Sequence, residues 1–197
     1  IGSIILLAPI ARLIATGLTP VVNNTLIKIG DIIQSSTDTN PLIMGIVLGG
    51  IITVVGTAPL SSMALTALLG LTGAPMAIGA MAAFSSAFMN SALFHRLKLG
   101  DRKSTISVGI EPLSQADIVS ANPIPIYVTN FFGGAIAGII IAWSGMINNA
   151  TGTATPIAGF LVMFGFNSLT KVIIYGVVMA IIGTIAGIVG SIVFKKY

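Results

Sequence analysis

The feature that most constrains this chain is a series of long apolar stretches that show no period-2 alternation. A helix needs about 20 apolar residues to cross the hydrocarbon core of a bilayer, whereas the strands of a membrane barrel alternate over about ten. Only 7% of the residues are charged, while soluble domains carry about 25%. We therefore predict an all-α polytopic membrane protein that resides in the lipid bilayer.

The apolar stretches are long enough for roughly five to six transmembrane helices. They are residues 1–22, 41–73, 74–94, 124–147 and 169–194. The stretch 41–73 exceeds one span and contains the polar cluster GTAPLSS at 56–62, which indicates either a broken helix or tight hairpin, or a plain proline kink. Residues 157–166 are too few to cross and are expected to be re-entrant. Small residues dominate 74–94, so we expect this helix to be central in the bundle.

Positive charge gathers at one predicted loop, residues 95–103, where four Lys and Arg residues accompany one Asp. Because cytoplasmic loops are enriched in Lys and Arg, we place this loop in the cytoplasm and the protein in the cell (inner) membrane. The C-terminal Lys195 and Lys196 then face the same side, after two further crossings. This topology explains the net charge of +4 better than nucleic-acid binding does.

The remaining organisation follows from the same patterns. Residues 23–40 alternate apolar and polar side chains at helical spacing, which predicts an amphipathic helix on the membrane surface. We treat residues 1–197 as one transmembrane domain. The apolar start at Ile1 suggests that this domain is the C-terminal part of a longer chain.

A polar segment at 108–132 interrupts the apolar chain and is the first candidate for a ligand site. It carries Glu111, and an ionised carboxylate at bilayer depth costs about 3 kcal/mol unless it has a partner, a proton or water. In a cavity, a carboxylate and neighbouring amides can bind the hydroxyl groups of a neutral ligand. Alternatively, Glu111 caps a helix that begins at Pro112, and no ligand is involved.

The motifs GIEP and NP, at Glu111–Pro112 and Asn122–Pro123, resemble the signature of a membrane family. This family is the sugar-translocating EIIC subunit of the phosphoenolpyruvate-dependent phosphotransferase system. The chain is most similar to the small EIIC-like group that includes the perfringolysin O regulator. Further shared motifs are PLxMG (Pro41, Leu42, Met44, Gly45), PxSS (Pro59, Ser61, Ser62), GLTG at 70–73 and MxNN (Met146, Asn148, Asn149).

The resemblance implies an EIIC fold, usually dimeric, in which re-entrant hairpins enclose a sugar. Glu111 would then bind sugar hydroxyls and Asn122 would shape the pocket. The predicted substrate-binding residues are Glu111, Gln115, Asp117, Asn122, Asn130 and Ser61.

Two departures from the family pattern affect the predicted function. The only histidine, His95, falls in the basic loop, although the family places one near the phosphorylated sugar hydroxyl, here around 56–59. Gln115 and Ala116 also replace the usual FG. We assign no catalytic residue, cofactor or metal site, and phosphate would come from separate cytoplasmic phosphotransferase proteins. The sequence thus predicts a sugar permease; the alternative is a membrane sensor or regulator that kept the pocket and lost transport.

Overall fold

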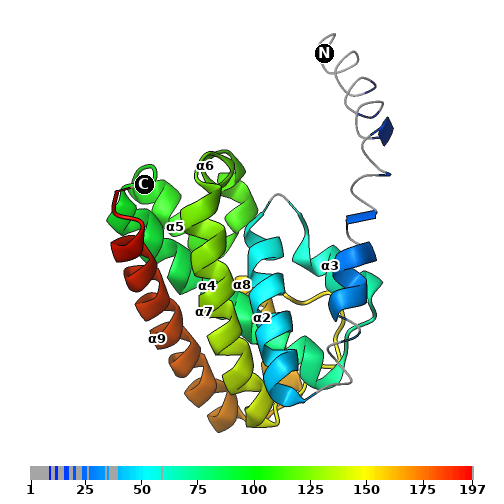
Figure 1. Cartoon of the computed structure of the whole chain (residues 1–197). Helices are drawn as coiled ribbons and strands as arrows, with labels where there is room; N and C mark the ends of the chain where they lie inside the picture. The colour runs from blue at the N-terminus through cyan, green and yellow to red at the C-terminus, as the bar shows by residue number, and fades with distance from the viewer. Residues whose placement is uncertain are drawn as a thin grey trace.

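In a computed structural model, the chain is described continuously over residues 40–58 and 60–196 (Figure 1). Before residue 40 the described residues are Pro9, Arg12, Thr16, Gly17, Pro20, Asn24, Thr25, 27–33 and Ser35. The predicted span at 1–22 therefore lies largely outside the described residues.

The described chain is helical and contains no strand. Its elements are α2 (Pro41–Thr57), α3 (Ser62–Leu68), α4 (Gly73–Leu97), α5 (Arg102–Ile110), η1 (Pro112–Gln115), α6 (Ala116–Ala121), α7 (Pro123–Ser144), α8 (Pro156–Val162), η2 (Met163–Gly165) and α9 (Leu169–Val193). Among the described residues, α4, α7 and α9 are long and apolar enough to cross a membrane. With 17 residues, α2 is about 26 Å long, slightly short of a full span. The predicted all-α polytopic class is confirmed.

Helices α2 and α7 lie side by side and antiparallel, and glycines form their contact (Figure 1). A side chain on Gly49 would meet the backbone of Gly134, and one on Gly138 would meet the backbone of Gly45. Each helix thus contributes two glycines spaced four residues apart, the pattern that lets membrane helices approach closely. This approach brings the two backbones into direct contact.

Helix α4 is the central helix of the bundle and contacts α2, α5, α7, α8 and α9. Its residues are the most deeply buried of the three long helices. Gly183 and Gly187 of α9 lie against the backbone carbonyls of Ser85 and Met89 in α4. The prediction that small residues mark the central helix is confirmed.

The polar cluster at 56–62 separates two helices. Helix α2 ends at Thr57, Ala58 is extended, and the Ser61 hydroxyl accepts a hydrogen bond from the Ala64 amide (3.1 Å) to begin α3. The Ser62 hydroxyl donates to the Ala154 carbonyl (2.7 Å) in the loop before α8. The prediction of a broken helix or tight hairpin is confirmed, and the alternative of a plain proline kink is wrong.

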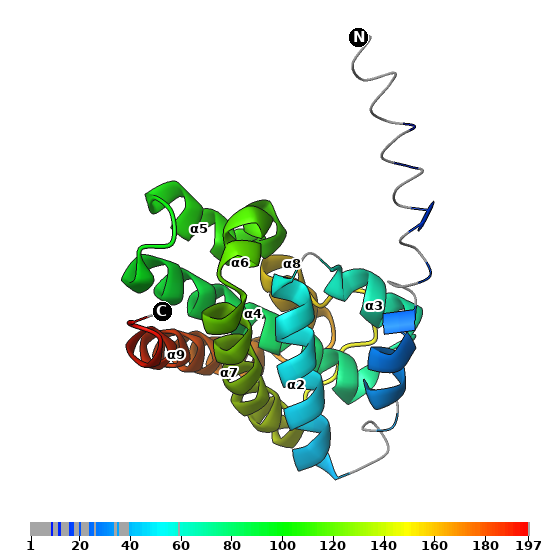
Figure 2. The same ribbon diagram turned by 45° about the horizontal axis from the view of Figure 1, so that its top comes forward.

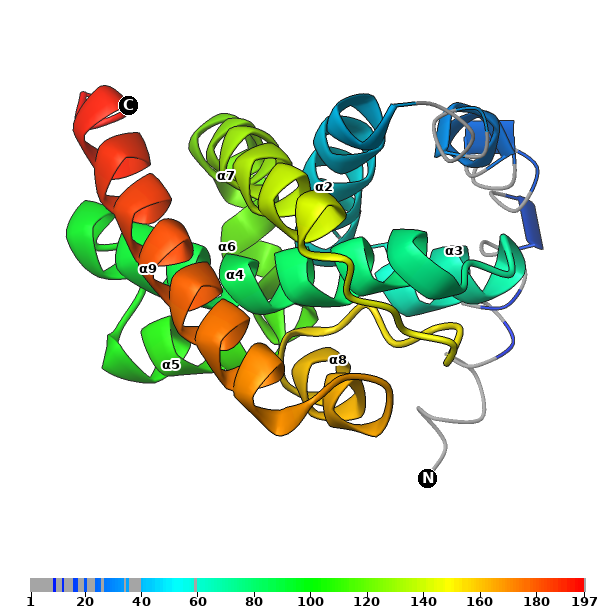
Figure 3. The ribbon, with the colours of Figure 1, turned by 90° about the horizontal axis from the view of Figure 1, so that it is seen from below.

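The short helix α8 packs against the side of α4 and does not cross the bundle (Figure 3). Phe160 of α8 stacks on Phe84 of α4, with ring centroids 4.2 Å apart. Gly159 lies beside Ala80, about one turn earlier on α4. Because these contacts are near the middle of α4, α8 has the position that a re-entrant segment requires.

The basic residues at 95–103 lie at the same end of the bundle as the C-terminus. The Arg96 side chain donates a hydrogen bond to the Ser191 hydroxyl (2.7 Å), which joins the ends of α4 and α9. The predicted loop is shorter than expected, because α4 continues to Leu97 and α5 begins at Arg102. Lys98 ends α4 in the left-handed region (φ 56°), and only residues 98–101 connect the helices.

Asp101 caps α5 and makes this helix start sensitive to pH. Its carboxylate accepts hydrogen bonds from the Ser104 amide (2.7 Å) and hydroxyl (2.9 Å). The Ser104 amide bond, together with the hydroxyl, lowers the pKa of Asp101 below its ordinary value of 3.8. The stabilisation by this cap is thus fully present above pH 3.8, the ordinary pKa, and is lost as the pH falls through the lowered pKa. We therefore expect the Ser104 amide to lose its protection from hydrogen exchange as the pH falls through the pKa of Asp101, once the rates are corrected for their intrinsic pH dependence. Asp101→Asn should remove this change, and equal pH dependence in both proteins would contradict it.

The segment at 23–40 is described only in part. The described residues from Asn24 to Ser35 are helical. Ile33 is buried and Gly30 lies against Leu69, whereas Ile32 is exposed. Apolar side chains of this segment therefore lie both in the protein interior and on its surface. The location of the segment on the membrane surface stays a prediction.

Candidate functional site

Glu111 lies at the junction between α5 and η1. It is the C-cap of α5, and its backbone carbonyl accepts hydrogen bonds from the Ser114 amide (3.0 Å) and hydroxyl (2.7 Å). Pro112 occupies the first position of η1, as the capping alternative requires. The Glu111 side chain, however, is exposed and makes no capping hydrogen bond. The backbone thus ends one helix and begins the next, while the carboxylate is not used for capping.

The other polar residues of this segment follow along η1 and α6 (Figure 2). The Gln115 amide donates to the Ser114 carbonyl (2.8 Å), and Asp117 is exposed in the first turn of α6. Asn122 stands between α6 and α7, where its amide donates to the Ile118 carbonyl (3.0 Å). That bond gives the Ile118 carbonyl, in the last turn of α6, a hydrogen-bond donor just before Pro123 begins α7. The structure therefore places Glu111, Gln115, Asp117 and Asn122 on one continuous segment.

This segment is anchored to the bundle by a small apolar core. The core contains Val108 of α5, Val119 of α6 and Ile126 of α7, packed on Leu93 and Phe94 near the end of α4. Helix η1 contacts α2, and α5 contacts α8. The polar segment thus lies beside both interrupted parts of the fold, the α2–α3 break and the short helix α8.

Ser61 lies in the α2–α3 break and is the N-cap residue of α3. Its hydroxyl caps α3, and its side chain is exposed. A role for Ser61 in substrate binding stays a prediction.

Asn130 lies apart from the other predicted site residues, fully buried in α7. Its side-chain amide donates to Asn90 Oδ1 of α4 (2.7 Å) and to the Ile126 carbonyl (2.9 Å). The Thr53 hydroxyl of α2 donates to the Asn130 carbonyl (2.8 Å). Asn90 Nδ2 in turn donates to the Thr57 hydroxyl (3.3 Å). These four residues, the buried polar network, connect α2, α4 and α7.

One acceptor atom of the buried polar network receives no hydrogen bond from the described part of the chain. Asn130 Oδ1 is inaccessible and has no hydrogen-bond partner among the described residues. Buried polar atoms of this kind are rare in proteins and call for an explanation such as a water or a ligand group. Thr57 places one end of the network at the last residue of α2, where the chain breaks.

Asn90 was missed by the sequence analysis, although a signal was present. It is the amide residue within the Ala-, Gly-, Ser- and Met-rich stretch 74–94. Amide side chains within membrane helices commonly form hydrogen bonds between helices. The stretch was interpreted for its small residues alone, and the polar side chain among them was overlooked.

His95 is exposed in the last turn of α4, at the basic end of the bundle. It is therefore separated along α4 from the α2–α3 break, where the family pattern expects a histidine. Within the part of the chain that the structure describes, no three His, Cys, Asp or Glu side chains gather where they could hold a metal ion.

Comparison with known proteins identifies the family of this chain. The family model described as "Phosphotransferase system, EIIC" matches residues 1–197, the full length of the sequence. No curated protein and no solved structure matches the chain. The match covers the GIEP and NP motifs and the whole helical bundle, which confirms the resemblance found from those motifs. The chain therefore belongs to the EIIC family of the phosphotransferase system.

Proposed function

We propose that this EIIC protein binds a small polar solute, a sugar, around Glu111 and Asn122 and carries it across the membrane. The observation that carries the proposal is the position of Glu111. Its carboxylate does not cap a helix, and it lies at a helix break beside the α2–α3 break and the short helix α8. Broken helices with exposed backbone groups are a common construction of transporter binding sites. Membership of the EIIC family supports the same function.

The chemistry of the segment suits a polyhydroxylated ligand. An ionised carboxylate accepts hydrogen bonds at both oxygens, and Gln115 and Asn122 can each donate and accept. One N–H of the Asn122 side-chain amide already donates to the Ile118 carbonyl, so its second N–H and its oxygen remain for a sugar hydroxyl. Asp117 adds a second exposed carboxylate in the first turn of α6. A neutral sugar would therefore meet mainly acceptors.

Translocation would proceed by an elevator-like movement of the interrupted segments, α2–α3 and α8 with the polar segment. Phosphate would come from separate phosphotransferase proteins that dock at the basic end, where Arg96, Arg102 and Lys103 are exposed. We expect the protein to work as a homodimer. The test is sugar uptake into proteoliposomes, with and without these phosphoryl donors. Uptake that depends on the donors supports a coupled permease.

The alternative function, a membrane sensor or regulator, is favoured by one observation. The single histidine, His95, is in the last turn of α4 and not in the α2–α3 break, so the position where the family pattern expects a histidine holds none. Sugar binding without uptake in either condition would support the sensor. No sugar binding at all would exclude both functions.

The proposed topology places the basic end in the cytoplasm, and it can be tested because the chain has no cysteine. Lys103→Cys should react with an impermeant thiol reagent only in inside-out vesicles. Thr151→Cys, in the loop before α8 and at the other end of α4, should react only from the outside. The reverse pattern would overturn the orientation.

A further inference from the structure

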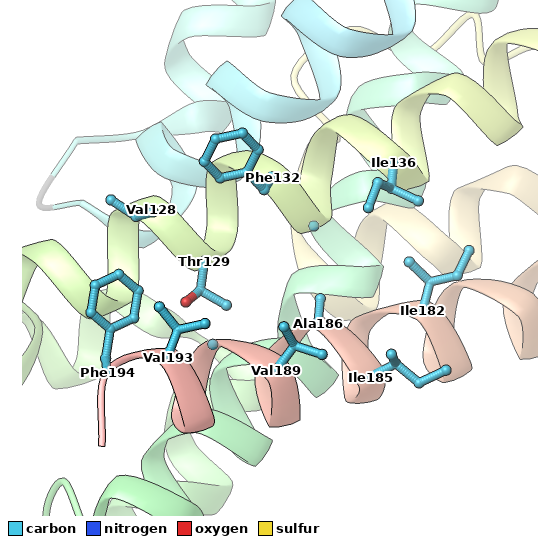
Figure 4. Close-up of a pocket in the computed structure, with 12 residues that line it drawn as sticks. Val128, Thr129, Phe132, Ile136, Ile182, Ile185, Ala186, Val189, Val193 and Phe194 are labelled. Atoms are coloured by element: carbon cyan, nitrogen blue, oxygen red, sulfur yellow. The ribbon is translucent and has the colours of Figure 1, made fainter. Parts of the chain in front are cut away.

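An apolar groove runs between α7 and α9 on the outside of the bundle (Figure 4). It has a volume of about 500 Å³. Its lining residues are Val128, Thr129, Phe132, Gly133, Ile136, Ile182, Ile185, Ala186, Val189, Gly190, Val193 and Phe194. Aliphatic and aromatic side chains from both helices form its walls, and small residues form its floor.

Water would find almost no hydrogen-bonding partner in this groove. Thr129 is the one polar side chain among the lining residues, and its hydroxyl is buried against Gly190. A water molecule needs two to four polar partners to remain in a cavity, so the groove suits a hydrocarbon chain. Its elongated form between two helices suits an acyl chain better than a compact ligand (Figure 4).

The groove faces the membrane. Helix α9 is the most exposed of the three long apolar helices, and Ile185 and Val189 on the groove's rim are both more than half exposed. In a bilayer, the surface that these residues present is in contact with lipid chains. A hydrocarbon chain therefore has direct access to the groove from the side.

Positive charge stands at one end of the groove. Phe194 closes that end, and the exposed residues Lys195 and Lys196 follow it directly. Arg96 is held at the same end of α9 by its hydrogen bond to Ser191 (2.7 Å). A lipid whose chain lies in the groove would thus have its headgroup near two or three cations, which favours a negatively charged headgroup.

We propose that the α7–α9 groove binds an anionic glycerophospholipid, with one acyl chain between the helices and the phosphate near Lys195 and Lys196. This site is separate from the proposed sugar site. The occupant is defined by charge as well as by apolar fit. A phospholipid with no net charge would fill the groove equally but would gain less from the lysines, because its cationic headgroup offsets its phosphate.

The test is native mass spectrometry of delipidated protein titrated with palmitoyl-oleoyl phosphatidylglycerol or with the matching phosphatidylcholine. We expect phosphatidylglycerol to bind more tightly. Lys195→Gln with Lys196→Gln should weaken phosphatidylglycerol binding by about thirtyfold, since each lysine near a membrane surface contributes on the order of 1 kcal/mol. The matched control, Arg102→Gln with Lys103→Gln, removes the same charge from α5 and should leave binding within about twofold.

A second pair of variants tests the groove itself. Val189→Trp places a large side chain in the groove, whereas Ile181→Trp enlarges an equally exposed position on α9 that does not line it. Only Val189→Trp should displace the lipid. Equal affinity for the two lipids, or unchanged lipid binding in Val189→Trp, would overturn the proposal. If Val189→Trp instead converts a dimer into monomers while lipid binding is unchanged, the groove is an interface between two copies and not a lipid site.

Discussion

Gly49→Leu is expected to prevent α2 from docking on α7 and to lower the free energy of unfolding by about 3 kcal/mol, the upper end of the usual cost of overpacking. A side chain at Gly49 would occupy the position of the Gly134 backbone, so no rotamer change can make room. The two helices would have to separate, which would also break the hydrogen bond from Thr53 to the Asn130 carbonyl. Leucine is a better helix former than glycine by about 1 kcal/mol, so the packing loss has to exceed this gain.

The expected loss can be measured by thermal unfolding in detergent, with the fluorescence of Trp143 at the end of α7 as the signal. Gly165→Leu is the matched control, because a side chain at Gly165 would meet nothing within 4 Å. We expect Gly165→Leu to melt close to the unmodified protein. If both variants melt alike, the close contact between α2 and α7 is not present in the membrane protein.

The second large effect is expected at the buried polar network. Asn90→Ala removes the acceptor of the Asn130 side chain and the donor to the Thr57 hydroxyl. Loss of one partner from a buried hydrogen bond costs about 1 to 3 kcal/mol, because the other group is left without water. We expect a destabilisation in this range, measured by the same unfolding signal.

A double-mutant cycle separates the hydrogen bond from the loss of volume. Asn90→Ala should cost less in an Asn130→Ala background than in the unmodified protein, by about 0.6 kcal/mol or more. Strictly additive effects would show that the two asparagines do not interact. A similar effect from Thr184→Val, on the exposed face of α9, would show that any polar loss destabilises the bundle equally.

The long helices could be predicted from the sequence because the bilayer fixes their length and apolar character. The predicted stretch 169–194 agrees with α9 (Leu169–Val193), and 124–147 agrees with α7 except at its end. The end of α4 was predicted too early, at residue 94, because His95 and Arg96 appeared to belong to a loop. In the structure Arg96 reaches Ser191, so a charged residue completes the last turn of the helix.

The candidate site was predicted only in part, for a similar reason. The segment from Glu111 to Asn122 is recognisable because it is polar within an apolar chain. Asn130 belongs to the same polar stretch, but Pro123 begins α7, which carries Asn130 about two turns into the bundle. Its pairing with Asn90 joins residues 40 positions apart and depends on how α4 and α7 are aligned. Hydropathy contains no information on that alignment.

The central claim, that Glu111 binds a sugar, is tested most directly by equilibrium binding to purified Glu111→Gln and Asp101→Asn. A sugar first selected by thermal shift of the unmodified protein would serve as the ligand, since a ligand that binds the folded state raises the melting temperature. A hydrogen bond to a charged group contributes about 1.5 to 3 kcal/mol and a neutral one about 0.5 to 1.5 kcal/mol. Glu111→Gln keeps one acceptor oxygen and loses the charge, so it should raise Kd by about tenfold. Asp101→Asn, which keeps its capping position on α5, should leave Kd unchanged. Equal Kd values for the two variants would remove Glu111 from the site and contradict the proposed function.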